Sequence, residues 1–340
     1  MSKVYKWGII GCGSVTELKS GPAYQKVEGF KLHAVMRRNI EKAKDYANRH
    51  KVPKFYGNAD ELINDSEIDA IYIATPPDSH YYYALKIAEA GKICCIEKPM
   101  APTYKECLLI NEAFETKKTP LFVAYYRRSL PRFKQIKSWI DNNKIGKIRH
   151  INWYLSKPAN DTDLAKTYNW RTDIKIAHGG YFDDLASHGI DLFVHFLGCI
   201  TEANGIAVNQ QGLYTAMDSV TGNWVHESGV TGSGSWNFGT EKREDYVQIY
   251  GENGKISFSV FGEVPIKLEH GTQKESLFIE NPENIQLFHV QNIKKQLLGP
   301  SESSGLPNNI KYVHFGVLED EKLKIYIAGY SLGLPSIAYV

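Results

Sequence analysis

The sequence predicts two domains: an α/β domain with a parallel sheet, followed by an α+β domain with a large, mostly antiparallel open sheet. Its 340 residues exceed the usual span of one hydrophobic core. In the first third, short apolar runs alternate with helix-like segments, which is typical of a parallel sheet covered on both faces. From residue 148 onward, strand-like segments follow one another through short turns. The change of pattern places the boundary near residue 124, with domains at 1–124 and 125–340.

The strands of the first domain are expected where short apolar runs occur. These runs cover residues 7–10, 31–37, 70–74, 92–96 and 121–124. Between them, residues 40–50 and 80–90 carry apolar side chains at helical spacing, and Gly91 stands where the second helix is expected to end. This alternation of strand and helix in short steps predicts the parallel sheet.

The second domain is expected to begin with a helix over residues 128–142. Its strands are expected at residues 148–155, 204–210, 215–225, 229–238, 244–251, 255–261 and 264–270. Short turns such as Gly-Glu-Asn-Gly at 251–254 favour antiparallel neighbours. Helices over 181–196 and 284–298 are expected to cover one face of this sheet. The segment 299–309 is rich in Pro, Ser and Gly and is expected to be a surface loop.

Composition excludes several classes of function. The net charge is only +2 and no long basic run occurs, so nucleic-acid binding has no electrostatic support. No apolar stretch approaches the roughly 20 residues of a membrane span. The N-terminal residues are expected to lead directly into a strand, with no signal peptide, and the five cysteines are odd in number and lack metal-ligand spacing. A reducing cytoplasm is therefore expected.

The glycine-rich turn after the first strand predicts a bound dinucleotide. In the Rossmann unit, a residue such as Gly11 makes the tight turn, and Gly13 lets the backbone approach the pyrophosphate. The helix that begins with Ser14 and Val15 then presents its N-terminus to the anion. Thr16 occupies the third glycine position. Glycine-rich turns without a ligand are common, but the place of this one after the first strand of an alternating sheet favours the nucleotide.

The end of the second strand distinguishes between two cofactors. NAD-binding proteins usually have an acidic residue there, which accepts hydrogen bonds from the ribose hydroxyls. This chain has Arg37 and Arg38 instead, and guanidinium groups pair well with a 2′-phosphate. The alternative is a solvated strand end. NADP(H) is therefore favoured, with NAD(H) as the second choice.

Lys98 is the first candidate catalytic residue. It follows an apolar strand and so emerges at the carboxyl edge of the sheet, where ligands bind in such folds. It stands between Glu97 and Pro99, and the proline disfavours a helical conformation at Lys98. Its ammonium group could polarise a substrate oxygen and stabilise an alkoxide. The alternative is an ordinary surface lysine.

Asp184 and His188 form the second candidate pair. Their spacing of four places both side chains on one face of a helix. Histidine is the natural proton shuttle near neutral pH, and the carboxylate could orient it. The alternative is a helical pair buried against the sheet. A metal site formed by His178, Asp184 and His188 is not expected.

Taken together, these motifs resemble the Gfo/Idh/MocA oxidoreductases, named for glucose-fructose oxidoreductase and inositol dehydrogenase. The resemblance extends over most of the chain, and the combination is much more specific than any single motif. It rests on the glycine-rich turn, residues 74–80 (Ala-Thr-Pro-Pro-Asp-Ser-His), Glu97-Lys98-Pro99, Trp170-Arg171, Gly179-Gly180 and the Asp184/His188 pair.

The resemblance implies roles for individual residues. Lys98, Asp184 and His188 would be the catalytic groups. Thr75, Pro76 and His80 would border the nicotinamide, and Glu97 its ribose. Tyr125, Tyr126, Arg127 and Arg128 would contact the substrate, and Trp170 and Arg171 would face the same cleft, although each could instead be a packing residue or a surface charge.

Three positions depart from the family pattern. Thr16 stands where Ala or Gly is common, which could alter how closely the helix meets the strand. His178 replaces the first glycine of a usual triplet and would bring a polar ring near the substrate. Arg37 stands where NAD-preferring members have Asp, in agreement with the charge argument.

The expected function is an NADP(H)-dependent oxidoreductase that interconverts a hydroxyl and a carbonyl on a sugar, cyclitol or related polyol. Lys98 and His188 would handle the hydroxyl proton. Two alternatives remain: an NAD(P)-dependent glycoside hydrolase that works by transient oxidation, and a non-catalytic dinucleotide-binding sensor. The broad sheet of the second domain is expected to pack against the same sheet of a second copy of the chain, in a homodimer or homotetramer. No nucleic-acid or membrane partner is expected.

Overall fold

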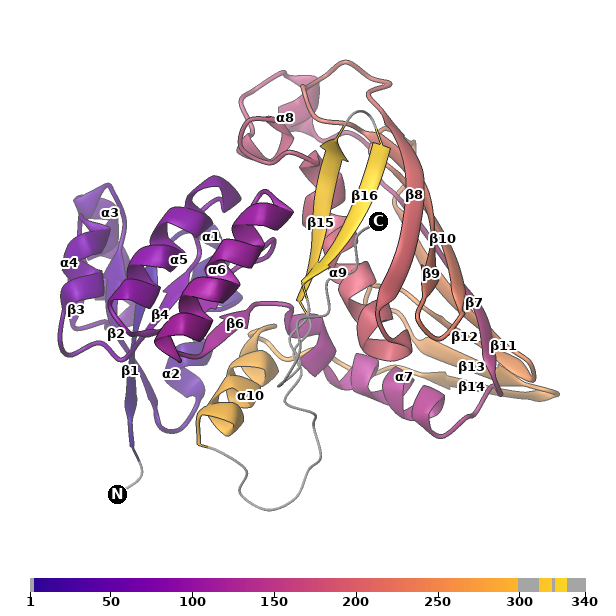
Figure 1. Ribbon diagram of the computed structural model, residues 1–340, viewed down its shortest axis with the longest axis horizontal. Helices are drawn as coiled ribbons and strands as arrows, with labels where there is room; N and C mark the ends of the chain where they lie inside the picture. The colour runs from indigo at the N-terminus through magenta and orange to yellow at the C-terminus, as the bar shows by residue number, and fades with distance from the viewer. Residues whose placement is uncertain (1–2, 299–311, 320–321, 329–340) are drawn as a thin grey trace. The chain divides into compact units, whose positions relative to one another are not determined.

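The computed structural model describes residues 3–298, 312–319 and 322–328 (Figure 1). It divides into two compact units. The first contains the residues up to Ala101, Lys105–Ser129 and the segment that starts at Pro282. The second contains Pro102–Tyr104, Leu130–Asn281 and the two C-terminal strands. The expected surface loop at 299–309 lies outside the described residues.

The first unit is built on a six-stranded sheet in the order β3-β2-β1-β4-β5-β6, and all its pairs are parallel. The strands are β1 (Tyr5–Ile10), β2 (Phe30–Met36), β3 (Lys54–Tyr56), β4 (Ala70–Ile73), β5 (Ile93–Ile96) and β6 (Leu121–Val123). The central strands are almost entirely buried, as their continuous apolar runs require in a sheet covered on both faces. This strand order is that of a dinucleotide-binding fold.

Helices flank this sheet in Figure 1. They are α1 (Ser14–Leu18), α2 (Ala23–Lys26), α3 (Ile40–His50), α4 (Ala59–Asn64), α5 (His80–Glu89) and α6 (Tyr104–Lys117), with the short 3-10 helices η1 (Pro77–Ser79) and η2 (Tyr126–Ser129). The expected helices at 40–50 and 80–90 are confirmed. The side chain of Asn39 accepts a hydrogen bond from the Lys42 backbone N–H, which explains where α3 begins.

The second unit is built on a ten-stranded sheet in the order β14-β13-β12-β11-β7-β10-β9-β8-β16-β15. Its pairs are antiparallel except β7 with β10, so the predicted fold class is confirmed. The strands are β7 (Ile148–Ser156), β8 (Ile200–Val208), β9 (Ser219–His226), β10 (Thr231–Asn237), β11 (Glu244–Gly251), β12 (Gly254–Phe258), β13 (Ile266–His270), β14 (Gln273–Leu277), β15 (Tyr312–Glu319) and β16 (Lys322–Ala328). The helical segments of this unit are α7 (Pro131–Asp141), α8 (Asp161–Leu164), η3 (Trp170–Thr172) and α9 (Gly180–Leu197).

Helix α9 lies against one face of this sheet (Figure 1). The contact is aromatic: Trp153 of β7 packs edge-to-face with Phe193 of α9 and with Trp236 of β10, at centroid distances of 5.6 and 5.4 Å. A Cβ atom on Gly189 would come within 2.3 Å of the Trp153 ring. Glycine at that position therefore allows the helix to approach the sheet closely, and this packing fixes how α9 is rotated about its own axis.

Helix α10 (Leu287–Leu297) corrects one expectation. The segment 284–298 was expected on the antiparallel sheet, but it packs within the first unit against α2 and η2. The Asn284 side chain donates to the carbonyl oxygen of Leu18 at 2.7 Å, and Asn292 donates to Ser129 Oγ at 2.8 Å. Apolar periodicity shows which face of a helix is buried, but not which surface buries it. No helix within the described ranges is long and apolar enough to cross a membrane.

Candidate functional site

The carboxyl ends of the parallel strands lie level with one another. Ile10, the last residue of β1, is in register with Met36 of β2 and Ile73 of β4, while Ile73 pairs with Ile96 of β5. Ile96 in turn pairs with the end of β6. The residues that follow these ends therefore share one edge of the sheet. They include the expected cofactor residues Gly11, Gly13, Ser14 and Val15 after β1, Arg37 and Arg38 after β2, Thr75, Pro76 and His80 after β4, and Glu97 and Lys98 after β5, together with Tyr125 and Arg127 after β6.

The glycine-rich turn requires glycine at its first position. Gly11 has a φ of +93°, and a Cβ atom there would lie 2.7 Å from the Thr75 side chain. The backbone N–H groups of Gly11 and Cys12 both donate to the carbonyl oxygen of Met36, at 2.9 and 3.2 Å. A Cβ atom on Gly13, in contrast, would meet only the Gly11 carbonyl oxygen, at 3.8 Å. Packing therefore explains Gly11 but leaves open space beside Gly13.

Thr16 fits the turn in spite of its departure from the family pattern. The residue is fully buried, and its hydroxyl donates to the carbonyl oxygen of Gly13 at 2.8 Å. The Tyr46 hydroxyl donates to the carbonyl oxygen of Thr16 at 2.8 Å. The close approach is made by Gly21, where a Cβ atom would lie 2.3 Å from both of those oxygens. The third glycine is thus replaced by a threonine that stabilises the turn by hydrogen bonds.

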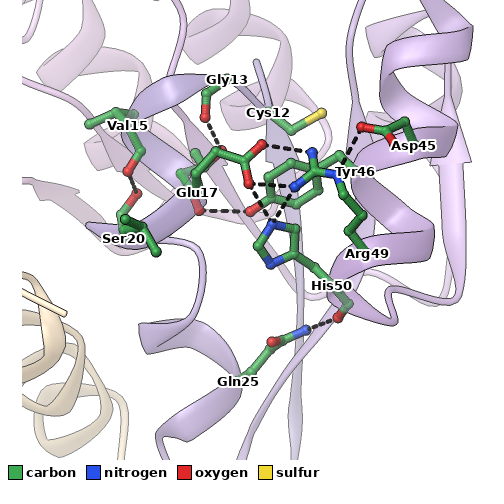
Figure 2. Close-up of polar contacts among 12 residues, drawn as sticks. Cys12, Gly13, Val15, Glu17, Ser20, Gln25, Asp45, Tyr46, Arg49 and His50 are labelled. Carbon is green, nitrogen blue, oxygen red and sulfur yellow. Dashed lines mark hydrogen bonds and ion pairs between the residues drawn. The ribbon is translucent and has the colours of Figure 1, made fainter. Parts of the chain in front are cut away.

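A polar network that the sequence did not predict joins α1 to α3 (Figure 2). Both terminal nitrogens of Arg49 donate to the two oxygens of Glu17 at 2.8 Å, and His50 Nε2 lies 2.7 Å from Glu17 Oε2. Arg49 also donates to Asp45 at 2.9 Å, while the His50 ring stacks on Tyr46. The hydrogen bonds from Arg49, above all, lower the pKa of Glu17 to about 2. The five-residue helix α1 is therefore held in place by charge-assisted bonds from its neighbour.

Arg37 and Arg38 differ in their surroundings. Arg37 is half-buried, and its Nη1 donates to the carbonyl oxygen of Cys12 at 3.4 Å, so its guanidinium group lies beside the glycine-rich turn. Arg38 is exposed. Burial raises the pKa of Cys12 to about 11, although Arg37 acts in the opposite direction. Cys12 is therefore a neutral packing residue beneath the arginine.

His80 bridges the ends of two strands. It is fully buried, with Nδ1 2.9 Å from the carbonyl oxygen of Pro99 and Nε2 2.8 Å from that of Thr75. Burial lowers the pKa of His80 below its ordinary value, although both carbonyls act in the opposite direction. A neutral ring donates to one of these two carbonyls, and its contacts link the loop after β4 to the loop after β5.

Glu97 is held in place from three sides. It is only 8% exposed, and both the Tyr72 hydroxyl and Gln286 Nε2 donate to its Oε1, the latter at 2.7 Å. The backbone N–H of Lys98 donates to Glu97 Oε2 at 3.2 Å. Burial and the adjacent Glu97 raise the pKa of Tyr72 well above its ordinary value, so its phenol remains a donor. The sequence pointed to Glu97 but not to Gln286, which lies 189 residues further along the chain.

In the second unit, helix α9 carries Asp184 and His188 on one face, as their spacing predicts. Asp184 is half-buried, and its Oδ2 lies 3.6 Å from Arg171 Nε. His188 is 5% exposed, with its ring edge-on to Phe261 at 5.9 Å. Asp183 Oδ2 accepts a hydrogen bond from the Gly179 backbone N–H at 2.9 Å, which stabilises the start of the helix.

The segment before α9 brings Arg171 to Asp184. Arg171 belongs to η3, and its guanidinium lies 4.3 Å from the Trp170 ring. His178 is half-buried and directly precedes the helix start. Gly180 has a φ of +59°, and a Cβ atom there would lie 2.6 Å from the Cβ of Ala216, so the segment turns tightly into α9. The structure thus joins Arg171, Trp170 and Asp184 in one polar group.

In the part of the chain that the structure describes, one cluster has metal-ligand spacing: His33, Asp65 and Glu67. Lys54 Nζ lies 2.8 Å from Asp65 and 2.5 Å from Glu67, and Lys6 Nζ lies 2.9 Å from Glu67. Two ammonium groups therefore already balance the carboxylates. This cluster is an ion-pair network.

Comparisons with known proteins agree with this geometry. Residues 5–125 match the model of the Gfo/Idh/MocA oxidoreductase family with NAD-binding Rossmann fold, and residues 133–257 match the C-terminal domain of the same family. "Oxidoreductase P35" from Formosa agariphila is 41% identical over 84% of this chain and 88% of its own length. Trans-1,2-dihydrobenzene-1,2-diol dehydrogenase from Xenopus laevis is 29% identical over 45% of this chain and 47% of its own length.

Solved structures share the fold. Levoglucosan dehydrogenase in complex with NADH and levoglucosan has a TM-score of 0.73, with 21% identity over 84% of this chain and 83% of its own. Both family models match consecutive parts of the chain and together span more than half of it. The chain therefore belongs to the Gfo/Idh/MocA family of oxidoreductases and has the NAD-binding Rossmann fold of that family.

Proposed function

We propose that the chain is an NADP(H)-dependent oxidoreductase that interconverts a hydroxyl and a carbonyl group on a sugar, cyclitol or related polyol. The observation that carries this proposal is the level carboxyl edge of the parallel sheet, where the glycine-rich turn, Arg37, Thr75 and Lys98 follow neighbouring strand ends. The strand order reverses between β1 and β4, and ligands bind at such a switch point.

The residues of the glycine-rich turn fit a dinucleotide. The positive φ of Gly11 and the open space beside Gly13 suit a pyrophosphate that approaches the backbone, with the N–H groups of Ser14 and Val15 as donors. When bound, the nicotinamide supplies the hydride chemistry. The fully buried Thr16 and the Glu17–Arg49 pair would keep the turn in a single conformation.

Arg37 and Arg38 support NADP(H) over NAD(H). Arg37 already lies beside the turn, and no acidic residue follows β2 to accept from the ribose hydroxyls. We infer that Arg37 pairs with the 2′-phosphate and that Arg38 adds charge from the exposed side. The family also includes NAD users, since the levoglucosan dehydrogenase complex contains NADH.

For the nicotinamide end, we propose that Thr75 and Pro76 border the ring and that Glu97 accepts from its ribose. His80 would act by holding the loop backbone, because both of its ring nitrogens already contact carbonyl oxygens. Glu97 Oε2 would accept from the ribose in addition to the Lys98 backbone N–H, since Tyr72 and Gln286 donate to Oε1.

The proton chemistry is assigned to Lys98, Asp184 and His188. The Lys98 ammonium would polarise the reacting oxygen and stabilise an alkoxide. His188 would accept the hydroxyl proton during oxidation and return it during reduction, and Asp184 would orient its ring. Tyr125, Arg127, Trp170, Arg171 and His178 are proposed to contact the substrate.

A substrate panel tests this function. The purified protein is assayed with sugars and cyclitols and with NADP⁺ or NAD⁺, and reduced nicotinamide is followed by its near-ultraviolet absorbance. We expect reduction with at least one polyol and a higher kcat/KM for NADP⁺. Release of a free sugar from a glycoside without net cofactor reduction would instead indicate hydrolysis by transient oxidation. No turnover with any compound, together with dinucleotide binding, would indicate a sensor.

We also propose that the chain forms a homodimer or homotetramer through the open face of its large sheet. Trp153 and Leu155 of β7 are buried, while Tyr154 between them is 38% exposed. Tyr154 lies directly opposite Tyr246 of β11, which is 48% exposed. Large aromatic side chains on one sheet face are typical of an interface between subunits.

A further inference from the structure

The function proposed above assigns no role to Lys157. It follows strand β7 and is half-buried. Its backbone is fixed, because its N–H donates to the Asn237 carbonyl oxygen at 3.0 Å and its own carbonyl accepts from the Thr240 N–H at 3.3 Å. Its Nζ lies 3.6 Å from the centroid of the Tyr181 ring. Tyr181 belongs to the first turn of α9, three residues before Asp184.

The aromatic ring beneath Lys157 is itself rigid. The Tyr181 hydroxyl donates to Oδ2 of the buried Asp163 at 2.8 Å. It also accepts from the side-chain amides of Asn160 and Asn169, at 2.7 and 3.0 Å. Because Tyr181 and Asp184 are three residues apart on one helix, they lie on the same face. The Lys157 ammonium is therefore held on the face of α9 that carries the candidate catalytic carboxylate.

Charged residues of both signs surround Lys157. Burial lowers the pKa of Lys157; Asp163 and Asp184 oppose this effect, while Arg243 and Arg171 add to it. Asp163 is engaged by Tyr181, and Asp184 lies 3.6 Å from Arg171. Within the described residues, no carboxylate lies at ion-pair distance from Lys157. A partly buried ammonium is costly unless an anion pairs with it, so Lys157 would gain from an anionic partner.

We propose that Lys157 is a substrate-recognition residue that binds the carboxylate of an acidic sugar, which makes uronic or aldonic acids the substrate class. This inference rests on the proposed function, because it takes the face of α9 that carries Asp184 as the substrate side. The single positive charge of the ammonium matches that of one carboxylate, whereas a phosphate dianion would exceed it. The ammonium can donate charge-assisted hydrogen bonds to the carboxylate oxygens while it stays over the Tyr181 ring.

The test compares each sugar acid with the corresponding uncharged amide. Wild type and the variants Lys157→Met, Lys157→Arg and Lys267→Met are assayed with NADP⁺ on hexuronates and hexonates, on the primary amide of each, and on hexose 6-phosphates. Lys267 is exposed on β13 and serves as the matched control. We expect wild type to prefer the acids, and Lys157→Met to lower kcat/KM for the acids by about 10- to 100-fold with little change for the amides. Lys157→Arg should retain most of the preference, and Lys267→Met all of it.

Three results would overturn the proposal. They are a wild type that oxidises amides as well as acids, a wild type that prefers phosphates, and a Lys157→Met variant that loses acids and amides equally, as a purely structural lysine would. If no compound is oxidised, the proposed function has failed, and thermal-shift titration then decides on Lys157 alone. Saturable stabilisation by a hexuronate that Lys157→Met abolishes supports the anion site, and equal shifts in both proteins reject it.

Discussion

Arg37 is the residue at which the choice between two cofactors can be tested. Its guanidinium lies beside the glycine-rich turn and donates to the carbonyl oxygen of Cys12. Replacement by aspartate would remove the cation and present an acceptor to the ribose hydroxyls instead. We expect Arg37→Asp to lower kcat/KM for NADP⁺ by about 10- to 100-fold, which corresponds to one charge-assisted hydrogen bond, and to raise it for NAD⁺.

The control for this exchange is the neighbouring Arg38→Ala, which removes an exposed cation without providing an acceptor. It should weaken NADP⁺ less and leave NAD⁺ unchanged. Steady-state kinetics gives kcat/KM of both variants with NADP⁺ and with NAD⁺. If the Arg37→Asp variant favours NADP⁺ as strongly as wild type does, Arg37 does not recognise the 2′-phosphate and belongs to a solvated strand end.

Single residues show how far local reasoning extends. Gly11 could be predicted from its position after the first strand, because a tight turn there needs a positive φ. Lys98 could be placed at the sheet edge because it follows an apolar strand. The donors that hold Glu97 could not be predicted, since Gln286 approaches it from the far end of the chain. Lys157 gave no sequence signal, because its importance lies in the neighbours that surround its ammonium group.

At the scale of elements, the contact between α1 and α3 responds to pH. The ordinary pKa of Glu17 is 4.5, and hydrogen bonds from Arg49 and His50 lower it to about 2 in the folded protein. A depressed pKa means that the folded state favours the ionised carboxylate. Its contribution is therefore complete above about pH 4.5 and is lost as the pH falls toward 2.

We expect Glu17→Gln to lower the free energy of unfolding at neutral pH by about 0.5–1 kcal/mol, as is usual for a partly exposed ion pair. The variant should also lose less stability than wild type between pH 4.5 and 2. Urea unfolding at a series of pH values measures both effects. Glu241→Gln, at an exposed position, is the control and should follow wild type. Parallel pH curves for wild type and Glu17→Gln would show that the network contributes nothing.

The elements that the sequence predicted have a clear pattern, although the C-terminal strands β15 and β16 were not predicted. Helix α3 begins and ends as expected, because its cap residue and its apolar spacing agree. The three-residue strand β3 and the mostly exposed β14 were missed, since neither contains an apolar run. Strand β8 ends at Val208 and β9 begins at Ser219, so the connection between them is longer than expected; in it, Asp218 accepts hydrogen bonds from the backbone of Gln210 and Gln211. Helix α10 was recognised as a helix but assigned to the wrong unit, because its partners are distant in sequence.

At the scale of the whole molecule, we propose that the open face of the large sheet mediates assembly. Tyr154 and Tyr246 lie opposite each other on that face and are both exposed. We expect wild type to be a dimer or tetramer by size-exclusion chromatography with light scattering, and the double variant Tyr154→Lys with Tyr246→Lys to be a monomer, because buried ammonium groups would oppose association. Tyr168→Lys, at another exposed tyrosine, should keep the wild-type mass. A monomeric wild type would contradict the proposal.

The proposed chemistry requires Lys98, from the first unit, and His188, from the second, in a single reaction. The most direct test uses the two single variants Lys98→Met and His188→Asn. Each is compared with wild type by single-turnover NADPH formation and by fluorescence titration of the cofactor. We expect both variants to bind NADPH with nearly unchanged affinity, while the rate of hydride transfer falls by about 10²- to 10⁴-fold in each. A wild-type rate in either variant would contradict the mechanism.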